Sequence, residues 1–134
     1  MARIKQLHHV AVVVEDIDAA LAFWRDTLGL SVQEVRDVPA QKTQVAFLPV
    51  GDSQVELVRP ETDDSGVARY LAKYGPGMHH VCLATDDLDG LLAELKRRGV
   101  RLINPEPLVN AEGHKYAFVH PDSASGVLLE LTEE

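Results

Sequence analysis

The chain has 134 residues with 13 Lys and Arg against 21 Asp and Glu, which gives a formal net charge of −8. This length and a hydrophobic content of 46% favour one compact domain with a real core. The acidic balance argues against wrapping of nucleic acid, so we expect no nucleic-acid partner. We expect no membrane partner and a cytoplasmic location, because the sequence has no long apolar run and no secretory signal pattern. The single Cys82 excludes a disulfide scaffold.

The first elements in chain order are a strand and a helix. Residues 7–14 are rich in Val, Ala and other apolar side chains, which predicts a buried strand. Asp16 is the predicted N-cap of a helix, and Gly29 stands in the stop position. The predicted apolar stripe of this helix comprises Ile17, Ala20, Leu21, Trp24 and Leu28. Short strands are then predicted over residues 31–38, 43–50 and 54–58, followed by a connecting helix over residues 65–74.

The second half of the chain predicts the same series of elements. A strand over residues 78–85 precedes a helix that is capped by Asp87 and stopped by Gly99. The stripe of this helix comprises Leu88, Leu91, Leu92 and Leu95. Strands are predicted over residues 100–103, 115–119 and 127–131. Each half therefore has the order β-α-β-β-β.

The two halves are also similar residue by residue. Leu7-His8-His9-Val10 recurs 71 positions later as Met78-His79-His80-Val81. Val55-Glu56-Leu57 recurs as Leu129-Glu130-Leu131 once three residues are inserted. Such self-similarity indicates an internal repeat. We predict a single domain over residues 1–134, with repeats at about 5–60 and 76–134 joined by a helix at about 64–75.

The repeat singles out four residues with metal-binding chemistry. His9 corresponds to His80, and Glu56 corresponds to Glu130, which lies among apolar residues of a strand as Glu56 does. One such residue alone is more often solvent-facing, but a carboxylate in an apolar strand is costly unless it is paired. Two imidazoles and two carboxylates at equivalent positions favour a shared site for a divalent transition metal. Because side chains alternate along a strand, one histidine of each His-His pair faces that site.

The remaining histidines have less specific interpretations. His8 and His79 are predicted to be structural. His114 and His120 lie in a loop and at a strand end, where contact with a substrate and a plain surface position are both open.

These residues resemble the vicinal oxygen chelate superfamily and, within it, the methylmalonyl-CoA epimerase family. The more specific stretches are the connecting helix before Gly77-Met78-His79-His80-Val81, and His120-Pro121 leading to the Leu129-Glu130-Leu131 ending. The resemblance implies an α+β fold in which two pseudo-symmetric βαβββ modules form a cupped mixed sheet around a metal site. It also implies a homodimer, an acyl-CoA substrate and a divalent metal (Co, Mn, Ni, Zn or Fe) held by His9, Glu56, His80 and Glu130.

The resemblance further implies epimerisation of (2R)- and (2S)-methylmalonyl-CoA through a thioester enolate. We expect Glu130 to act as one catalytic base, with Glu56 or a group not identified from sequence on the opposite face. An extra acid/base glutamate of some epimerases is matched here by Val45, next to Gln44, so a two-glutamate assignment does not transfer unchanged. If both glutamates were ligands only, a bound hydroxide would do the chemistry.

Two alternatives and one requirement follow from this assignment. A glyoxalase I-type lactoylglutathione lyase would use the same ligand set, and a non-catalytic binding module would share the fold without needing all four residues.

Binding of a polyanionic CoA also requires local positive charge on the protein. The candidates are Arg59, Lys96, Arg97, Arg98, Arg101, Lys115 and the loop at residues 110–114.

Overall fold

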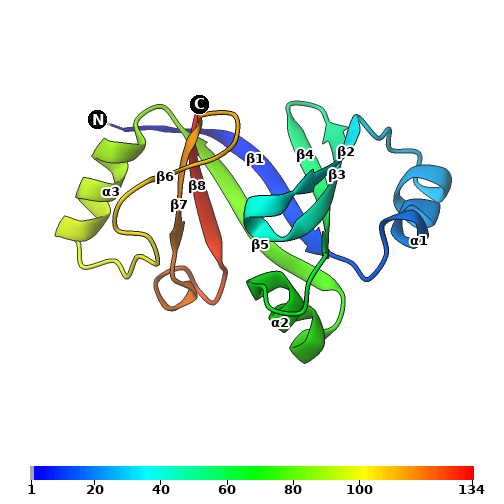
Figure 1. Cartoon of the computed structure of the whole chain (residues 1–134). Helices are drawn as coiled ribbons and strands as arrows, with labels where there is room; N and C mark the ends of the chain where they lie inside the picture. Colours follow the sequence, from blue (N-terminus) through cyan, green and yellow to red (C-terminus); the bar gives the residue numbers. More distant parts are fainter. Residues whose placement is uncertain (1) are drawn as a thin grey trace. The chain divides into compact units, whose positions relative to one another are not determined.

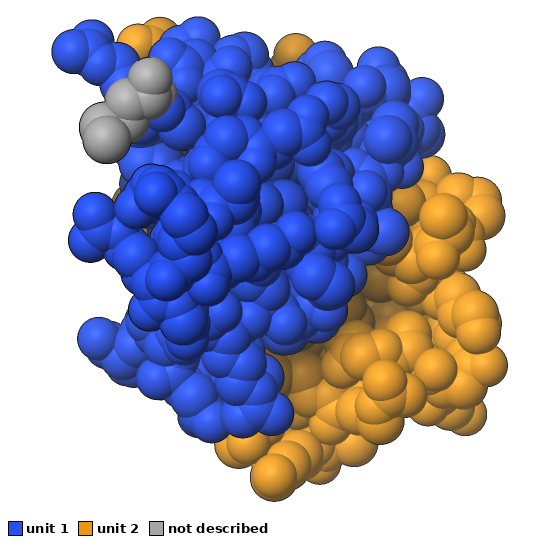
Figure 2. Space-filling view, turned by 90° about the vertical axis from the view of Figure 1, so that its left-hand side faces the viewer, with its two compact units in different colours: residues 1–8, 80–134 blue, residues 9–79 orange. Residues whose placement is uncertain are grey.

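The computed structural model describes residues 2–134, which form two compact units (Figure 2). One unit comprises residues 9–79, and the other comprises the residues up to His8 together with residues 80–134. The division passes through the strands β1 (Ile4–Val13) and β5 (Gly77–Thr85), between the two histidines of each His-His pair. We keep the single domain over residues 1–134 as a prediction.

The unit of residues 9–79 holds a four-stranded sheet in the order β2-β3-β4-β1 (Figure 1). Strand β1 pairs with β4 in parallel, and the other neighbours are antiparallel. Its elements after β1 are α1 (Ile17–Leu21), the π-helix η1 (Ala22–Thr27), β2 (Glu34–Val38), the 3-10 turn η2 (Pro39–Gln41), β3 (Thr43–Val50), β4 (Ser53–Pro60) and α2 (Gly66–Tyr74). Ser65 caps α2 by accepting a hydrogen bond from the Ala68 N–H, so the predicted connecting helix is confirmed.

The other unit repeats this plan with the order β5-β8-β7-β6. Strand β5 pairs with β8 in parallel, and β8-β7 and β7-β6 are antiparallel. Its elements are β5, α3 (Leu88–Arg97), β6 (Leu108–Val109), β7 (Lys115–Val119), the 3-10 turn η3 (Pro121–Ser123) and β8 (Leu129–Glu133). The repeated β-α-β-β-β order is therefore confirmed.

The first helix of each repeat starts and stops as predicted. Asp16 Oδ1 accepts a hydrogen bond of 3.0 Å from the Ala19 N–H, and Asp87 Oδ1 accepts one of the same length from the Gly90 N–H. Each cap satisfies a backbone donor that the first helical turn leaves unpaired. Both stop residues have a left-handed backbone, with φ of 92° at Gly29 and 75° at Gly99, which glycine adopts without a Cβ penalty.

Each helix buries its apolar stripe against one face of its own sheet. In residues 9–79 the core of α1 and this face comprises Val14, Ile17, Leu21, Ala46, Leu48 and Leu57. In the other unit the core of α3 and its sheet comprises Leu88, Leu92, Ala117, Val119 and Leu131. Because side chains alternate along a strand, Glu56 and Glu130, which neighbour Leu57 and Leu131, lie on the face away from the helix. Because each helix covers one face of its sheet, Glu56 and Glu130 lie on the uncovered face.

The prediction that Leu28 lies in the apolar stripe is wrong. After Leu21 the helix widens, and the Leu28 N–H donates to the Phe23 carbonyl five residues earlier (2.8 Å). The extra residue in this turn rotates the following side chains about the helix axis. Leu28 is consequently 53% exposed, whereas Trp24 still packs against the core.

The strand predicted over residues 100–103 is also wrong. Leu102 forms an isolated bridge with Val119, and the edge strand beside β7 is the two-residue β6. Val100 and Leu102 pack against the core of α3. Among the described residues, the backbone of this segment bonds to the end of β7 only through Ile103 to Phe118, Asn104 to Phe118 and His120 to Arg101. Two other strands begin two or three residues later than predicted, at Glu34 and Leu129. No helix among residues 2–134 is long and apolar enough to span a membrane.

Candidate metal centre

His9 and Glu56 form a close pair in the unit of residues 9–79. Their strands β1 and β4 run in parallel, with Ala11 opposite Glu56. His9 lies two residues before Ala11 and therefore on the same face of the sheet. The Nδ1 atom of His9 lies 3.2 Å from Oε2 of Glu56. Both side chains are largely withdrawn from solvent, with 8% and 15% exposed.

His80 and Glu130 form the corresponding pair in the other unit. Cys82 lies opposite Glu130 in the parallel pair of β5 and β8, so His80 again lies two residues before the partner of the glutamate. The Nε2 atom of His80 lies 3.0 Å from Oε1 of Glu130, and the side chains are 13% and 15% exposed. The register of the histidine strand and the glutamate strand is therefore the same in both repeats.

The aromatic neighbours of the glutamates repeat as well. Phe47 lies opposite Glu56 across β3 and β4, and Phe118 lies opposite Glu130 across β7 and β8. The ring of His80 packs edge-on against Phe118, with 5.4 Å between ring centroids and 87° between ring planes. These phenylalanines are not among the site residues predicted from the sequence. Their separation of 71 residues, the offset of the repeat, is the signal that identifies them.

The donor atoms of the two pairs fit a divalent transition metal. A carboxylate withdrawn from water is costly unless a positive charge lies beside it, and a neutral imidazole supplies none. A cation shared by the imidazole nitrogen and the carboxylate oxygen satisfies both groups of each pair. Nitrogen and oxygen donors together suit metals such as Zn, Co, Ni, Mn and Fe.

The neighbouring histidines contact other residues. His8 Nε2 lies 3.7 Å from Glu134 Oε2. The ring of His79 packs against Tyr70 of α2 at 5.1 Å between centroids, and the Tyr70 hydroxyl donates a hydrogen bond of 2.8 Å to the Met78 carbonyl. The two histidines of each adjacent pair therefore have different partners, as strand alternation predicts.

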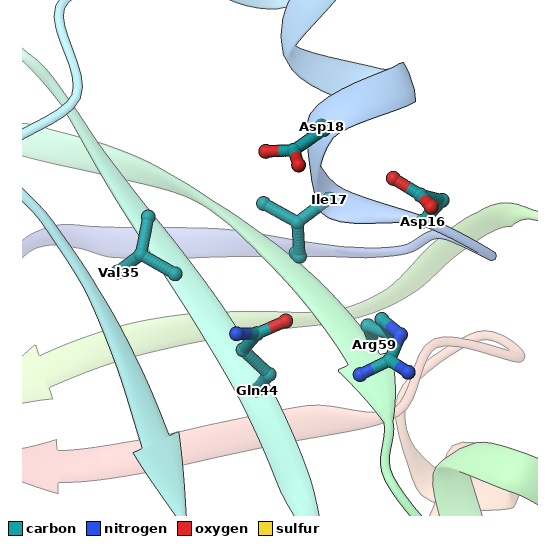
Figure 3. A pocket seen from close by; sticks show the side chains of 6 residues that line it. All are labelled: Asp16, Ile17, Asp18, Val35, Gln44 and Arg59. Carbon is teal, nitrogen blue, oxygen red and sulfur yellow. The ribbon is translucent and has the colours of Figure 1, made fainter.

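The structure places Val45 and Gln44 on opposite faces of β3. Val45 is 4% exposed and packs with Ala11 and Val58. Gln44 lies opposite Arg59 on the α1 side, where the two residues line a small hollow together with Asp16, Ile17, Asp18 and Val35 (Figure 3). Val45 thus carries no acid or base on the face of Glu56, and Gln44 lies on the other face.

Most of the candidate cations for CoA already have acidic partners. The ion pairs are Lys96 with Glu106, Arg97 and Arg98 with Glu94, Arg101 with Asp122, and Lys115 with Asp89. The hydrogen bond to Asp89 raises the pKa of Lys115. Arg59 lines the hollow shown in Figure 3, as Asp16 does.

The two other histidines lie in local turns of the chain. The exposed His114 donates its backbone N–H to Asn110 Oδ1 at 2.9 Å. His120 Nδ1 accepts a hydrogen bond of 3.0 Å from the Asp122 N–H. Both contacts shape a local turn of the chain.

Comparison with known proteins defines the class of protein to which this fold and these residues belong. The family model described as the glyoxalase/bleomycin resistance protein/dioxygenase superfamily matches residues 8–118. The chain belongs to this superfamily and, within it, to the methylmalonyl-CoA epimerase family.

Several relatives of this chain are named as methylmalonyl-CoA epimerases. The mitochondrial methylmalonyl-CoA epimerase of Mus musculus is 36% identical over 98% of this chain and 74% of its own length. The ethylmalonyl-CoA/methylmalonyl-CoA epimerase of Cereibacter sphaeroides is 35% identical over 97% of this chain and 98% of its own. A solved methylmalonyl-CoA epimerase in complex with methylmalonyl-CoA and NH4+ superposes with a TM-score of 0.88 at 32% identity, covering 98% of this chain and 96% of that one. A lactoylglutathione lyase of Arabidopsis thaliana is more distant, at 28% identity over 91% of this chain and 43% of its own length.

Proposed function

We propose that this protein interconverts (2R)- and (2S)-methylmalonyl-CoA. The observation that carries the proposal is the pair of equivalent His–Glu contacts, at 3.2 Å and 3.0 Å, in a chain whose epimerase relatives match nearly its whole length. The substrate is an acyl-CoA in which the reacting carbon lies between a thioester and a carboxylate. The thioester carbonyl accepts the electron pair that is left when the hydrogen of this carbon is removed, which gives an enolate.

The ligands of the proposed metal are His9, Glu56, His80 and Glu130, which supply two nitrogen and two oxygen donors. A divalent cation bound by them would supply Lewis-acid stabilisation of the negative charge that develops on the thioester oxygen. Metal binding is supported by the superfamily and by the donor chemistry of the pairs.

The proton transfers are assigned to the glutamates. Glu130 removes the proton from the reacting carbon, and the electron pair of the broken C–H bond enters the enolate. Inversion is complete when the enolate carbon takes a proton on the opposite face from Glu56 in its protonated form or from another acid there, which leaves that group as its conjugate base. Each group must come within hydrogen-bond reach of the carbon, so the glutamate that acts as base must loosen from any metal as substrate binds.

The epimerase assignment is favoured over the lyase for a specific reason. Epimerase relatives reach 35–36% identity and cover up to 98% of their own length, whereas the lyase match covers 43% of that enzyme. A non-catalytic binding module would not need both His–Glu pairs. Incubation with methylglyoxal and glutathione distinguishes the lyase from the epimerase, because an epimerase would leave both compounds unconsumed.

The deciding experiment is a stereochemical assay with (2S)-methylmalonyl-CoA. We expect formation of the (2R) epimer to stop after chelation and to recover when Co, Mn, Ni, Zn or Fe is added back. Turnover that persists in the fully chelated protein would refute the metal-dependent mechanism. Absence of turnover with every metal would refute the substrate assignment.

Two further parts of the proposal concern the protein in the cell. The homodimer is supported by the family resemblance, and light scattering of the purified protein tests it. The cytoplasmic location stays a prediction, and fractionation of the source cells tests it.

A further inference from the structure

The repeats match at the glutamates and phenylalanines, and they differ at a neighbouring position on the same sheet face. Phe47 and Phe118 lie opposite Glu56 and Glu130. Two residues before each phenylalanine, and therefore on the same face, the first repeat has Val45 and the second has Tyr116. The second repeat thus carries a phenol where the first repeat has a valine.

The surroundings of these two residues also differ. Val45 is 4% exposed and closed in by Ala11 and Val58. Tyr116 is half-buried, and its ring packs edge-on against Phe118 with 6.3 Å between centroids and 89° between planes. Within residues 2–134 its hydroxyl makes no hydrogen bond. This phenol is therefore available to a bound molecule.

The register of β7 and β8 brings Tyr116 within reach of a molecule at Glu130. Tyr116 lies opposite Thr132, which is two residues from Glu130 and on the same face. Tyr116 and Glu130 are therefore diagonal neighbours on adjacent strands. Diagonal neighbours lie about 7–8 Å apart, a distance that an aromatic side chain spans. The Thr132 hydroxyl donates to the Lys115 carbonyl at 3.2 Å, and the Lys115 ammonium pairs with Asp89 at 2.7 Å. The phenol of Tyr116 is thus the uncommitted donor beside Glu130 on this strand.

We propose that the Tyr116 hydroxyl donates a hydrogen bond to the free carboxylate of the acyl-CoA substrate and so selects 2-carboxyacyl thioesters. The proposal rests on the proposed function. A phenol is protonated at neutral pH and donates well to an anion, and hydrogen bonds to charged acceptors are the stronger ones. Selection arises because a plain acyl thioester has no carboxylate to accept this bond.

The test uses calorimetry to compare binding of malonyl-CoA with binding of propionyl-CoA, in which a methyl group takes the place of the carboxylate. We expect Tyr116→Phe to weaken malonyl-CoA binding about tenfold and to leave propionyl-CoA binding within twofold. Tyr116→Val, which reproduces the residue of the first repeat, should give the same pattern. Tyr74→Phe is the matched control, because Tyr74 lies on α2 and is 64% exposed. Thermal unfolding of each variant verifies that it is folded.

The outcomes separate this inference from the proposed function. If the wild-type protein epimerises methylmalonyl-CoA but Tyr116→Phe weakens both probes equally, or neither, the role of Tyr116 is refuted and the function stands. If the wild-type protein neither epimerises methylmalonyl-CoA nor binds malonyl-CoA, both are refuted. A loss confined to malonyl-CoA supports the role of Tyr116.

Discussion

The Nε2 atom of His80 lies 3.0 Å from Oε1 of Glu130, and both groups sit on the sheet face opposite the helix of their repeat. Strand alternation and the parallel pairing of β5 with β8 produce this contact. The same register in β1 and β4 produces the contact of His9 with Glu56. These paired contacts lead to testable consequences for metal binding.

Replacement of either histidine should weaken binding of a divalent metal. We expect His9→Ala and His80→Ala each to reduce the affinity for Zn or Co by more than tenfold, because each variant loses one nitrogen donor. Equilibrium dialysis with metal analysis measures this affinity. His114→Ala is the control, since His114 lies in an exposed loop. Equal affinity in all three variants would contradict the ligand assignment.

Glu130→Gln should impair proton transfer at the reacting carbon while leaving the fold intact. Glutamine keeps the shape of the side chain but cannot accept the proton, so exchange of solvent deuterium into the reacting carbon should fall at least 100-fold. The exposed Glu15→Gln serves as the control and should exchange at the wild-type rate. Normal exchange in a metal-loaded Glu130→Gln protein would show that Glu130 is not the base.

The two helix-packing cores should respond alike to truncation. Leu57 is fully buried and Leu131 is 2% exposed, so Leu57→Ala and Leu131→Ala should each lower the free energy of unfolding by about 2–5 kcal/mol. Leu28→Ala, at a position that is 53% exposed, should change it by less than about 1 kcal/mol. Urea unfolding monitored by circular dichroism measures these values. A large loss at Leu28 would contradict the rotation that η1 introduces.

Asp64 should contribute to stability above about pH 4 and lose that contribution in acid. Hydrogen bonds from Lys42 (2.8 Å) and Thr62 (2.6 Å) lower the pKa of Asp64 from 3.8 to about 2. A carboxyl group whose pKa is depressed by folding stabilises the fold when ionised, and the contribution disappears as the pH falls toward 2. In Asp64→Asn the free energy of unfolding should fall less between pH 4 and pH 2 than in the wild-type protein. Identical acid profiles would contradict this role.

Much of the fold follows from the repeat and from local signals. Asp16 and Asp87 cap the predicted helices because a short acidic side chain reaches the free N–H groups of the first turn. The π-helical turn that exposes Leu28 is not visible in the sequence, because a period of 3.6 residues places Leu28 on the buried stripe. Residues 100–103 similarly carry no local sign that they form only a single bridge with β7, while Val100 and Leu102 pack against the core of α3.

The candidate site was partly predictable. The correspondence between the two repeats, together with strand alternation, singles out His9, Glu56 and their equivalents. The structure gives the distances within each pair. The facing direction of Gln44 depends on strand register, which the sequence leaves open. The ion pair of Lys115 with Asp89 depends on tertiary packing between β7 and the start of α3, so the availability of that cation was not predictable.

The outermost strand of residues 9–79, β2, has a consequence for the behaviour of the protein at high concentration. Three of its five residues are charged, namely Glu34, Arg36 and Asp37. Arg36 Nε lies 3.7 Å from Glu34, and the Arg36 guanidinium stacks over the ring of Phe47 at 4.8 Å. A strand from another molecule that paired with this edge would have to bring its own side chains against these charges. The sheet therefore ends in a built-in barrier to edge-to-edge aggregation.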